Sequence, residues 1–160
     1  MSRPFREHAF FLFVYGTLKC GFENHDKFCQ DALEIEEASV CGRLYDLPFG
    51  FPALLVPEET IHAAGTKDAI FDAATQHRLN KTAPILFRDE PRAFGELLTF
   101  DEPEERLPLL DRLEGFDPKG RSLYRRALIP AETATRSILV WTYVIEKPTG
   151  THLPGGHWPA

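Results

Sequence analysis

The sequence predicts an α+β fold in which six strands curl into a small β-barrel, formed by one domain over residues 1–160. The length supports one domain, because 160 residues are close to the usual size of a single folding unit. There are six candidate strands and few candidate helices, and the two types do not alternate strictly, which indicates α+β. Several strands are apolar on both faces, which favours a closed barrel over an open sheet with one face in water.

In the N-terminal half, apolar runs predict the strands, and turn residues separate them. The uninterrupted aromatic run before Gly16 is typical of a strand that is covered on both faces. Asn24 is a good N-cap for a following helix, with Asp26 in its first turn. Turn residues at 48–52 separate the next two strands. The expected elements are a strand over 10–15, a helix over 24–33, and strands over 39–47 and 53–56.

Residues 58–92 have a weaker pattern and are expected to be an insertion that forms a surface helix or a lid. Thr66 can cap a helix that runs to about Leu79. The stripe expected on this helix is only weakly apolar and consists of Ile70, Ala73, Ala74 and His77. The same face could form a dimer contact, so we expect a monomer or a weak homodimer.

The C-terminal half is expected to contain one helix between strands. Acidic residues and an early proline at 101–104 are a helix-start signature, and Gly115 is the natural residue after the helix end. Pro108 lies in the interior, where we expect the helix to kink or to restart. The expected strands are 94–100, 123–130 and 137–146.

Charge and cysteine content exclude several function classes. The net charge is −6 and there is no basic block, so nucleic acid is an unsuitable partner. The apolar run over 9–14 is too short for a membrane span of about 20 residues or for a signal peptide, and no longer run occurs. Three cysteines without tight spacing argue against a disulfide framework, so we expect a cytoplasmic protein.

Two acidic residues lie near the end of the helix that precedes Gly115. Glu114 would lie in the last turn, where the negative end of the helix dipole disfavours a carboxylate. Asp111, three residues earlier, places a like charge on nearly the same face. Both effects are expected to raise the pKa of Glu114, as a general acid and base near neutral pH requires. A solvated helix end beside Arg112 is the structural alternative.

Two further segments contain groups that bind oxygen atoms. A glycine at a strand end lets successive N–H groups face one point, so the loop Tyr15–Gly16–Thr17–Leu18 could form an oxyanion nest. Tyr124 could bind a substrate carboxylate, and Arg125 and Arg126 after it would point to opposite sides of the sheet. An ordinary turn, a tyrosine at the barrel rim and two surface arginines are the structural alternatives.

These segments occur together in an order that resembles the γ-glutamylcyclotransferase-like family, including its AIG2-like and γ-glutamylamine cyclotransferase branches. The resemblance covers nearly the whole chain except 58–92. The matching pieces are FVYGTLKCG (13–21), NH (24–25), GRLYDL (42–47), FPALL (51–55), FGELLTF (94–100), LDRLEG (110–115), LYRR (123–126), WTYV (141–144) and GGHW (155–158).

The resemblance implies a small mixed six-stranded β-barrel flanked by helices, with a pocket where the YGTL loop meets the barrel mouth. It also implies a reaction in which the α-amine of a small γ-glutamyl substrate attacks its own γ-carbonyl, giving 5-oxoproline and a free amine. Glu114 matches the catalytic glutamate of the family, and Tyr124 the tyrosine near the substrate carboxylate. The substrate-binding loop corresponds to Tyr15, Gly16, Thr17 and Leu18. No cofactor or metal is implied, because nucleophile and electrophile are on one molecule.

Three other functions fit parts of the sequence. Zinc could be bound by Cys20, His25, Cys29 and Cys41, but their spacing lacks the tight Cys pair of structural sites. A glycosidase-like carboxylate pair is disfavoured, because two acids one helical turn apart do not flank a bond. A non-catalytic binding module on the same fold is the main alternative, and the presence of Glu114 favours catalysis over it.

Overall fold

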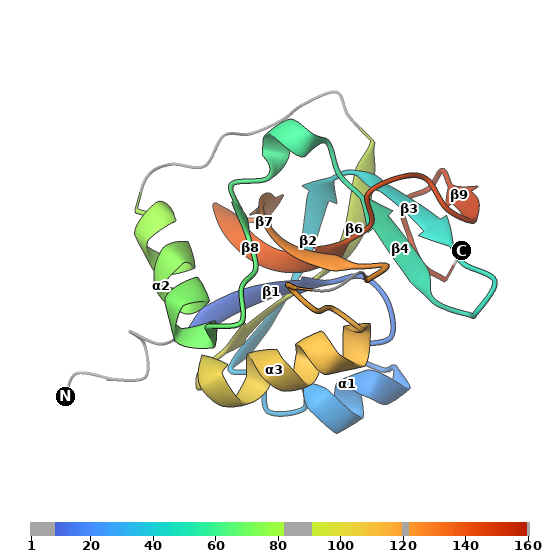
Figure 1. Ribbon diagram of the computed structural model, residues 1–160. Coiled ribbons are helices and arrows are strands. Elements are labelled where there is room, and N and C mark those ends of the chain that lie inside the picture. The colour runs from blue at the N-terminus through green and yellow to red at the C-terminus, as the bar shows by residue number, and fades with distance from the viewer. Residues whose placement is uncertain (1–8, 82–90, 120–121, 160) are drawn as a thin grey trace.

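The computed structural model describes residues 9–81, 91–119 and 122–159, and five of its strands form a closed barrel (Figure 1). Their order is β2-β6-β1-β8-β7, and β7 pairs again with β2 to close the ring. The sheet is mixed, because β1 and β8 are parallel while the other barrel pairs are antiparallel. The strands are β1 (Phe10–Val14), β2 (Glu34–Cys41), β6 (Arg92–Phe100), β7 (Arg125–Glu132) and β8 (Ser137–Val144).

The α+β class and the mixed barrel are confirmed, with a correction to the strand count. Five strands close the barrel, and the sixth is the short β5 (Ala63–Ala64), which is attached to the edge of β7. The strand expected over 53–56 belongs instead to a separate antiparallel sheet. That sheet consists of β4 (Pro52–Leu55), β3 (Arg43–Asp46) and β9 (Thr151–Leu153).

The prediction of one continuous strand over 39–47 is wrong, because the chain divides at Gly42 into the separate strands β2 and β3. A Cβ atom at Gly42 would lie 2.8 Å from the carbonyl oxygen of Leu55. The backbones therefore approach so closely that only glycine fits. At this point the chain leaves the barrel and enters the small sheet that forms one wall of the pocket described below.

The barrel strands β1 and β8 are buried on both faces, as their apolar patterns predict. In β1, Leu12 and Val14 belong to the cluster that packs against the helices, whereas Phe13 belongs to a second cluster on the opposite face. From Ile138 onward, every residue of β8 is buried. Two-sided burial of this kind leaves no face for water, which explains why the strands lack polar alternation.

Within the described ranges, three helices flank the barrel: α1 (Glu23–Phe28), α2 (Ala69–Leu79) and α3 (Pro103–Glu114). In Figure 1, α1 and α3 lie next to each other along one side and α2 lies on another flank. The helix α1 is shorter than the expected 24–33, and Phe22 rather than Asn24 is its N-cap. The helix α3 starts with Pro103 and continues through the exposed Pro108. None of the helices that the structure describes is both long and apolar enough to cross a membrane.

The described part of 58–92 packs against the body of the protein. The helix α2 contacts α3, β8 and β1, and a short 3-10 turn, η2 (Glu58–Thr60), precedes it. The N-cap of α2 is Asp68. The prediction of an apolar stripe on this helix is wrong, since Ile70, Ala74 and His77 are exposed. The buried face is mixed instead: Ala73 of the predicted stripe is buried in the core, but polar side chains are buried beside it. One of these, Gln76, bonds both the N–H and the carbonyl of Phe11. Residues 82–90 of the expected insertion lie outside the described residues.

Candidate active site

A pocket of about 410 Å³ opens where the loop after β1 meets the end of α3 and the turn between β3 and β4. This volume is in the usual range for small-molecule sites. The residues that the sequence singles out all line it, although they come from two distant parts of the chain: Tyr15, Gly16, Thr17 and Leu18 from one, Glu114 and Tyr124 from the other. No described residue between 58 and 81 lines this pocket, so the described part of the insertion does not cover it.

The loop Tyr15–Leu18 lines the pocket and contains backbone donors without a described partner. The N–H groups of Gly16, Thr17 and Leu18 donate to no other described residue. Glycine is needed at 16 because a Cβ atom would lie 2.7 Å from Cγ of Pro52; its φ angle is not positive, so the reason is space rather than turn conformation. Such a row of N–H groups is suited to bind an anion or a developing oxyanion.

Two residues of α1 hold this loop in place, and the sequence indicated neither role. The imidazole Nδ1 of the buried His25 donates to the carbonyl of Leu18 at 2.8 Å. The amide of Asn24, which also lines the pocket, donates to Oγ1 of Thr17 at 2.8 Å. The available signal is the Asn-His pair at 24–25, shortly after the loop, which the sequence analysis interprets as a helix start, as part of a family motif and, for His25, as a candidate zinc ligand.

Glu114 is the last residue of α3, and its partly buried side chain lines the pocket. Gly115 follows in the left-handed conformation (φ 72°) and ends the helix, as expected. Burial raises the pKa of the Glu114 carboxyl to about 7, and the negative charge of Asp111 contributes a smaller part. The sequence predicts the direction and the Asp111 contribution, but burial, the larger cause, depends on the surrounding fold.

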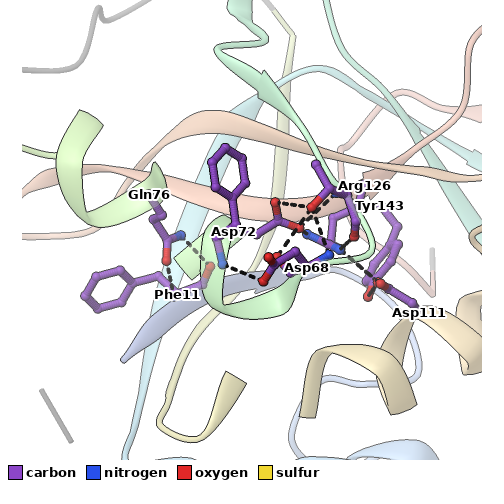
Figure 2. A network of polar contacts seen from close by, with 9 residues as sticks. Phe11, Asp68, Asp72, Gln76, Asp111, Arg126 and Tyr143 are labelled. Carbon is purple, nitrogen blue, oxygen red and sulfur yellow. Dashed lines mark hydrogen bonds and ion pairs between the residues drawn. The ribbon is translucent and has the colours of Figure 1, made fainter. Parts of the chain in front are cut away.

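Asp111 is not among the residues that line the pocket, and its carboxylate points toward the buried Arg126 (Figure 2). Nε of Arg126 lies 2.8 Å from Oδ1 of Asp111, and Nη2 lies 3.0 Å from Oδ2. The hydroxyl of Tyr143 donates to the same Oδ1 at 2.6 Å. The bidentate pair with Arg126 therefore fixes the position of the Asp111 carboxylate, which lies close to Glu114.

Arg126 is the centre of this network and is only 1% exposed. It also bonds Asp72 of α2 at 3.0 Å and the carbonyl of Thr66 at 3.0 Å, so that two carboxylates neutralise one cation. The alternative of two surface arginines is thus wrong for Arg126, while Arg125 pairs with Glu58 at the exposed side. The available signal was the alternation along β7, which places Arg126 on the same side as Tyr124 and Leu128.

Two of the pocket tyrosines, Tyr15 and Tyr124, donate their hydroxyl protons to backbone carbonyls. The hydroxyl of Tyr124 donates to the carbonyl of Pro52 at 2.7 Å, and that of Tyr15 donates to the carbonyl of Tyr143 at 2.7 Å. Burial, with a contribution from Glu114, raises the pKa of Tyr124 above its usual value, so the hydroxyl stays neutral. Its remaining capacity is to accept a hydrogen bond, for example from a substrate N–H group.

The four candidate zinc ligands do not form a cluster. Within the described ranges, no group of three or more His, Cys, Asp or Glu side chains is arranged to hold a metal ion. Cys20 is exposed, whereas Cys29 is buried and its pKa is raised to about 12 by burial. A thiol with this pKa stays protonated and behaves as a small apolar side chain.

Comparison with known proteins agrees with the fold and shows the family. Residues 12–67 and 60–160 match the family model described as gamma-glutamyl cyclotransferase, AIG2-like. Over 150 residues, 91% of this chain and 74% of the relative, the sequence is 26% identical to gamma-L-glutamyl-butirosin B gamma-glutamyl cyclotransferase from Niallia circulans.

Two solved structures are similar in fold. The first is YkqA from Bacillus subtilis, with a TM-score of 0.56 and 20% identity; the match covers 94% of this chain but only 39% of YkqA. The second is an AIG2-like protein from Mus musculus, with a TM-score of 0.55 and 21% identity, covering 86% of this chain and 77% of the mouse chain.

Proposed function

The chain belongs to the AIG2-like gamma-glutamyl cyclotransferase family, and from this membership we propose that it cyclises the γ-glutamyl group of a small molecule to 5-oxoproline and releases an amine. The single observation that supports this most is Glu114, a carboxyl with a pKa of about 7 in a pocket shared with the free N–H groups of the loop. At neutral pH such a group both accepts and donates protons.

The proposed reaction moves one proton in and one proton out through Glu114. The carboxylate takes a proton from the substrate α-ammonium, and the free amine then attacks the γ-carbonyl carbon of the same molecule. The carbonyl oxygen becomes negative, and the N–H groups of Gly16, Thr17 and Leu18 are suited to stabilise it, which is worth about 10²–10³-fold in rate per donor. When the bond to the departing nitrogen breaks, Glu114 returns its proton to that nitrogen. The ring nitrogen, which carries one extra proton after the attack, releases that proton to water, so the products are the neutral lactam of 5-oxoproline and the free amine.

The five-membered ring forms without an external nucleophile, because amine and carbonyl are held in one molecule. The protein therefore has to bind the γ-glutamyl group in a folded conformation. We assign this to the loop Tyr15–Leu18 together with Tyr124, whose hydroxyl can accept a hydrogen bond from the substrate ammonium. The cytoplasmic location and the monomeric or weakly dimeric state stay predictions.

The test is a panel of γ-glutamyl compounds, including glutathione and γ-glutamyl-ε-lysine, with detection of 5-oxoproline. We expect at least one to be converted, and we expect Glu114→Gln to lose about 10²–10⁴-fold in turnover while remaining folded. Undiminished turnover by Glu114→Gln would contradict the role of this residue. Binding of γ-glutamyl compounds without any product would favour the non-catalytic binding module.

A further inference from the structure

Three exposed apolar side chains surround the outer part of the pocket: Phe49, Phe51 and Leu123, which we call the apolar rim. They are 70%, 47% and 48% exposed, respectively, and all three line the pocket that contains Glu114. The inner lining is buried, including Tyr15, Leu18 and Tyr124 of the binding loop and β7 entrance. The pocket therefore has a closed inner part and an open apolar edge.

The rim is not part of the core, and a built turn holds its aromatic residues outside it. Phe49 and Phe51 lie in the turn between β3 and β4, which is closed by hydrogen bonds from Leu47 N–H to the Phe51 carbonyl (2.9 Å) and from Gly50 N–H to the Leu47 carbonyl (3.2 Å). No rim residue belongs to either buried cluster. Large apolar side chains that stay exposed at the edge of a pocket indicate a binding surface.

Among the described residues, the pocket has no charged side chain other than its reacting group. Of the described residues that line it, Glu114 is the one charged side chain. A departing amine that carries a carboxylate or a second ammonium would find no described partner at the rim. Desolvating such a charge without a partner is unfavourable, whereas an apolar carbon chain or ring would bury surface against the rim.

The proposed reaction fixes which half of the substrate meets the rim. The γ-glutamyl half is polar and needs the N–H groups of the loop and Glu114, which lie in the inner part. The departing amine has to leave into solvent, so it lies on the open side. We infer that the apolar rim is the subsite for the departing amine and that this amine has an apolar, preferably aromatic, carbon group. This inference rests on the proposed function.

The test compares three γ-glutamyl amides: the benzylamide, the methylamide and the ε-lysine conjugate. All three release alkyl amines, so the chemistry at the broken bond is similar and the side group differs. We expect kcat/KM for the benzylamide to exceed that for the other two by about tenfold or more, the usual scale of discrimination by an apolar subsite. We expect Phe49→Ala combined with Phe51→Ala to reduce this ratio to nearly one.

Phe71→Ala is the matched control, because Phe71 is 55% exposed on α2 and does not line the pocket. It should keep the wild-type ratio. If the methylamide or the lysine conjugate is converted as fast as the benzylamide, or if the double variant keeps the ratio, the subsite is rejected while the cyclotransferase function stands. If no γ-glutamyl amide yields 5-oxoproline, the proposed function fails and the subsite with it.

Discussion

Arg126 and Asp111 form a two-point pair that connects the barrel wall to α3 one helical turn before Glu114. The two hydrogen bonds measure 2.8 and 3.0 Å, and the arginine is buried. The pair has two consequences. It neutralises a buried cation, and it holds a negative charge near the proposed catalytic carboxyl, where that charge helps to raise the pKa of Glu114.

The first prediction concerns Asp111→Asn and the pH dependence of the reaction. Wild-type kcat/KM should fall as pH decreases below about 7, since Glu114 must be ionised to accept the first proton. The asparagine keeps an oxygen for Arg126 but removes the negative charge, so the pKa of Glu114 decreases and this limb moves to lower pH. Glu104→Gln, an exposed change on the same helix, should leave the profile in place. An unshifted profile in Asp111→Asn would show that Asp111 does not act on Glu114.

The second prediction is that Glu114 lowers stability at neutral pH. Its pKa is about 7 in the folded protein and 4.5 as a free side chain, so the folded state binds the proton more tightly. The proton on Glu114 therefore adds to the free energy of unfolding, by at most about 3 kcal/mol. This contribution is complete below pH 4.5 and is lost as the pH rises through 7. Wild type should therefore lose stability relative to Glu114→Gln between pH 4.5 and 7.5 in urea unfolding. A difference that is independent of pH would contradict the raised pKa.

The third prediction is that Arg126→Met strongly destabilises the protein. It leaves the carboxylate of Asp72, which is 1% exposed, without its cation, and removal of one partner from a buried pair costs about 3–5 kcal/mol. Arg125→Met is the control, because its pair with Glu58 is exposed and worth about 1 kcal/mol or less. Urea unfolding measures both. Equal losses in the two variants would mean that the buried network does not stabilise the fold.

The fourth prediction is that Gly16→Ala impairs catalysis by displacing the loop. The added methyl group would lie 2.7 Å from Cγ of Pro52, so the loop or the proline has to move. A shift of about 1 Å in a positioning group can reduce turnover on the order of 10²-fold. Gly155→Ala is the control, since a Cβ atom there meets nothing within 4 Å and φ is not positive. We would measure 5-oxoproline formation, and wild-type activity in Gly16→Ala would contradict the tight fit.

Local pattern was a reliable guide where one segment determines the outcome. The end of α3 at Gly115 and the two-faced burial of β8 follow from residue type and spacing alone. The grouping of Tyr15–Leu18, Glu114 and Tyr124 rested on the family resemblance, and the structure places them around one pocket. The prediction of an apolar stripe failed for α2, because much of its buried face is polar and a periodicity search recognises only apolar stripes.

The sequence by itself determined the α+β class, the positions of most strands along the chain, and the residue types available for acid–base chemistry and oxyanion binding. Only the tertiary structure decided that five strands close the barrel, that Arg126 is buried between Asp72 and Asp111, and that burial dominates the pKa of Glu114. The reason is distance along the chain: Arg126 bonds Asp72 across 54 positions. Strand pairing and desolvation depend on such long-range contacts, which local propensity does not encode.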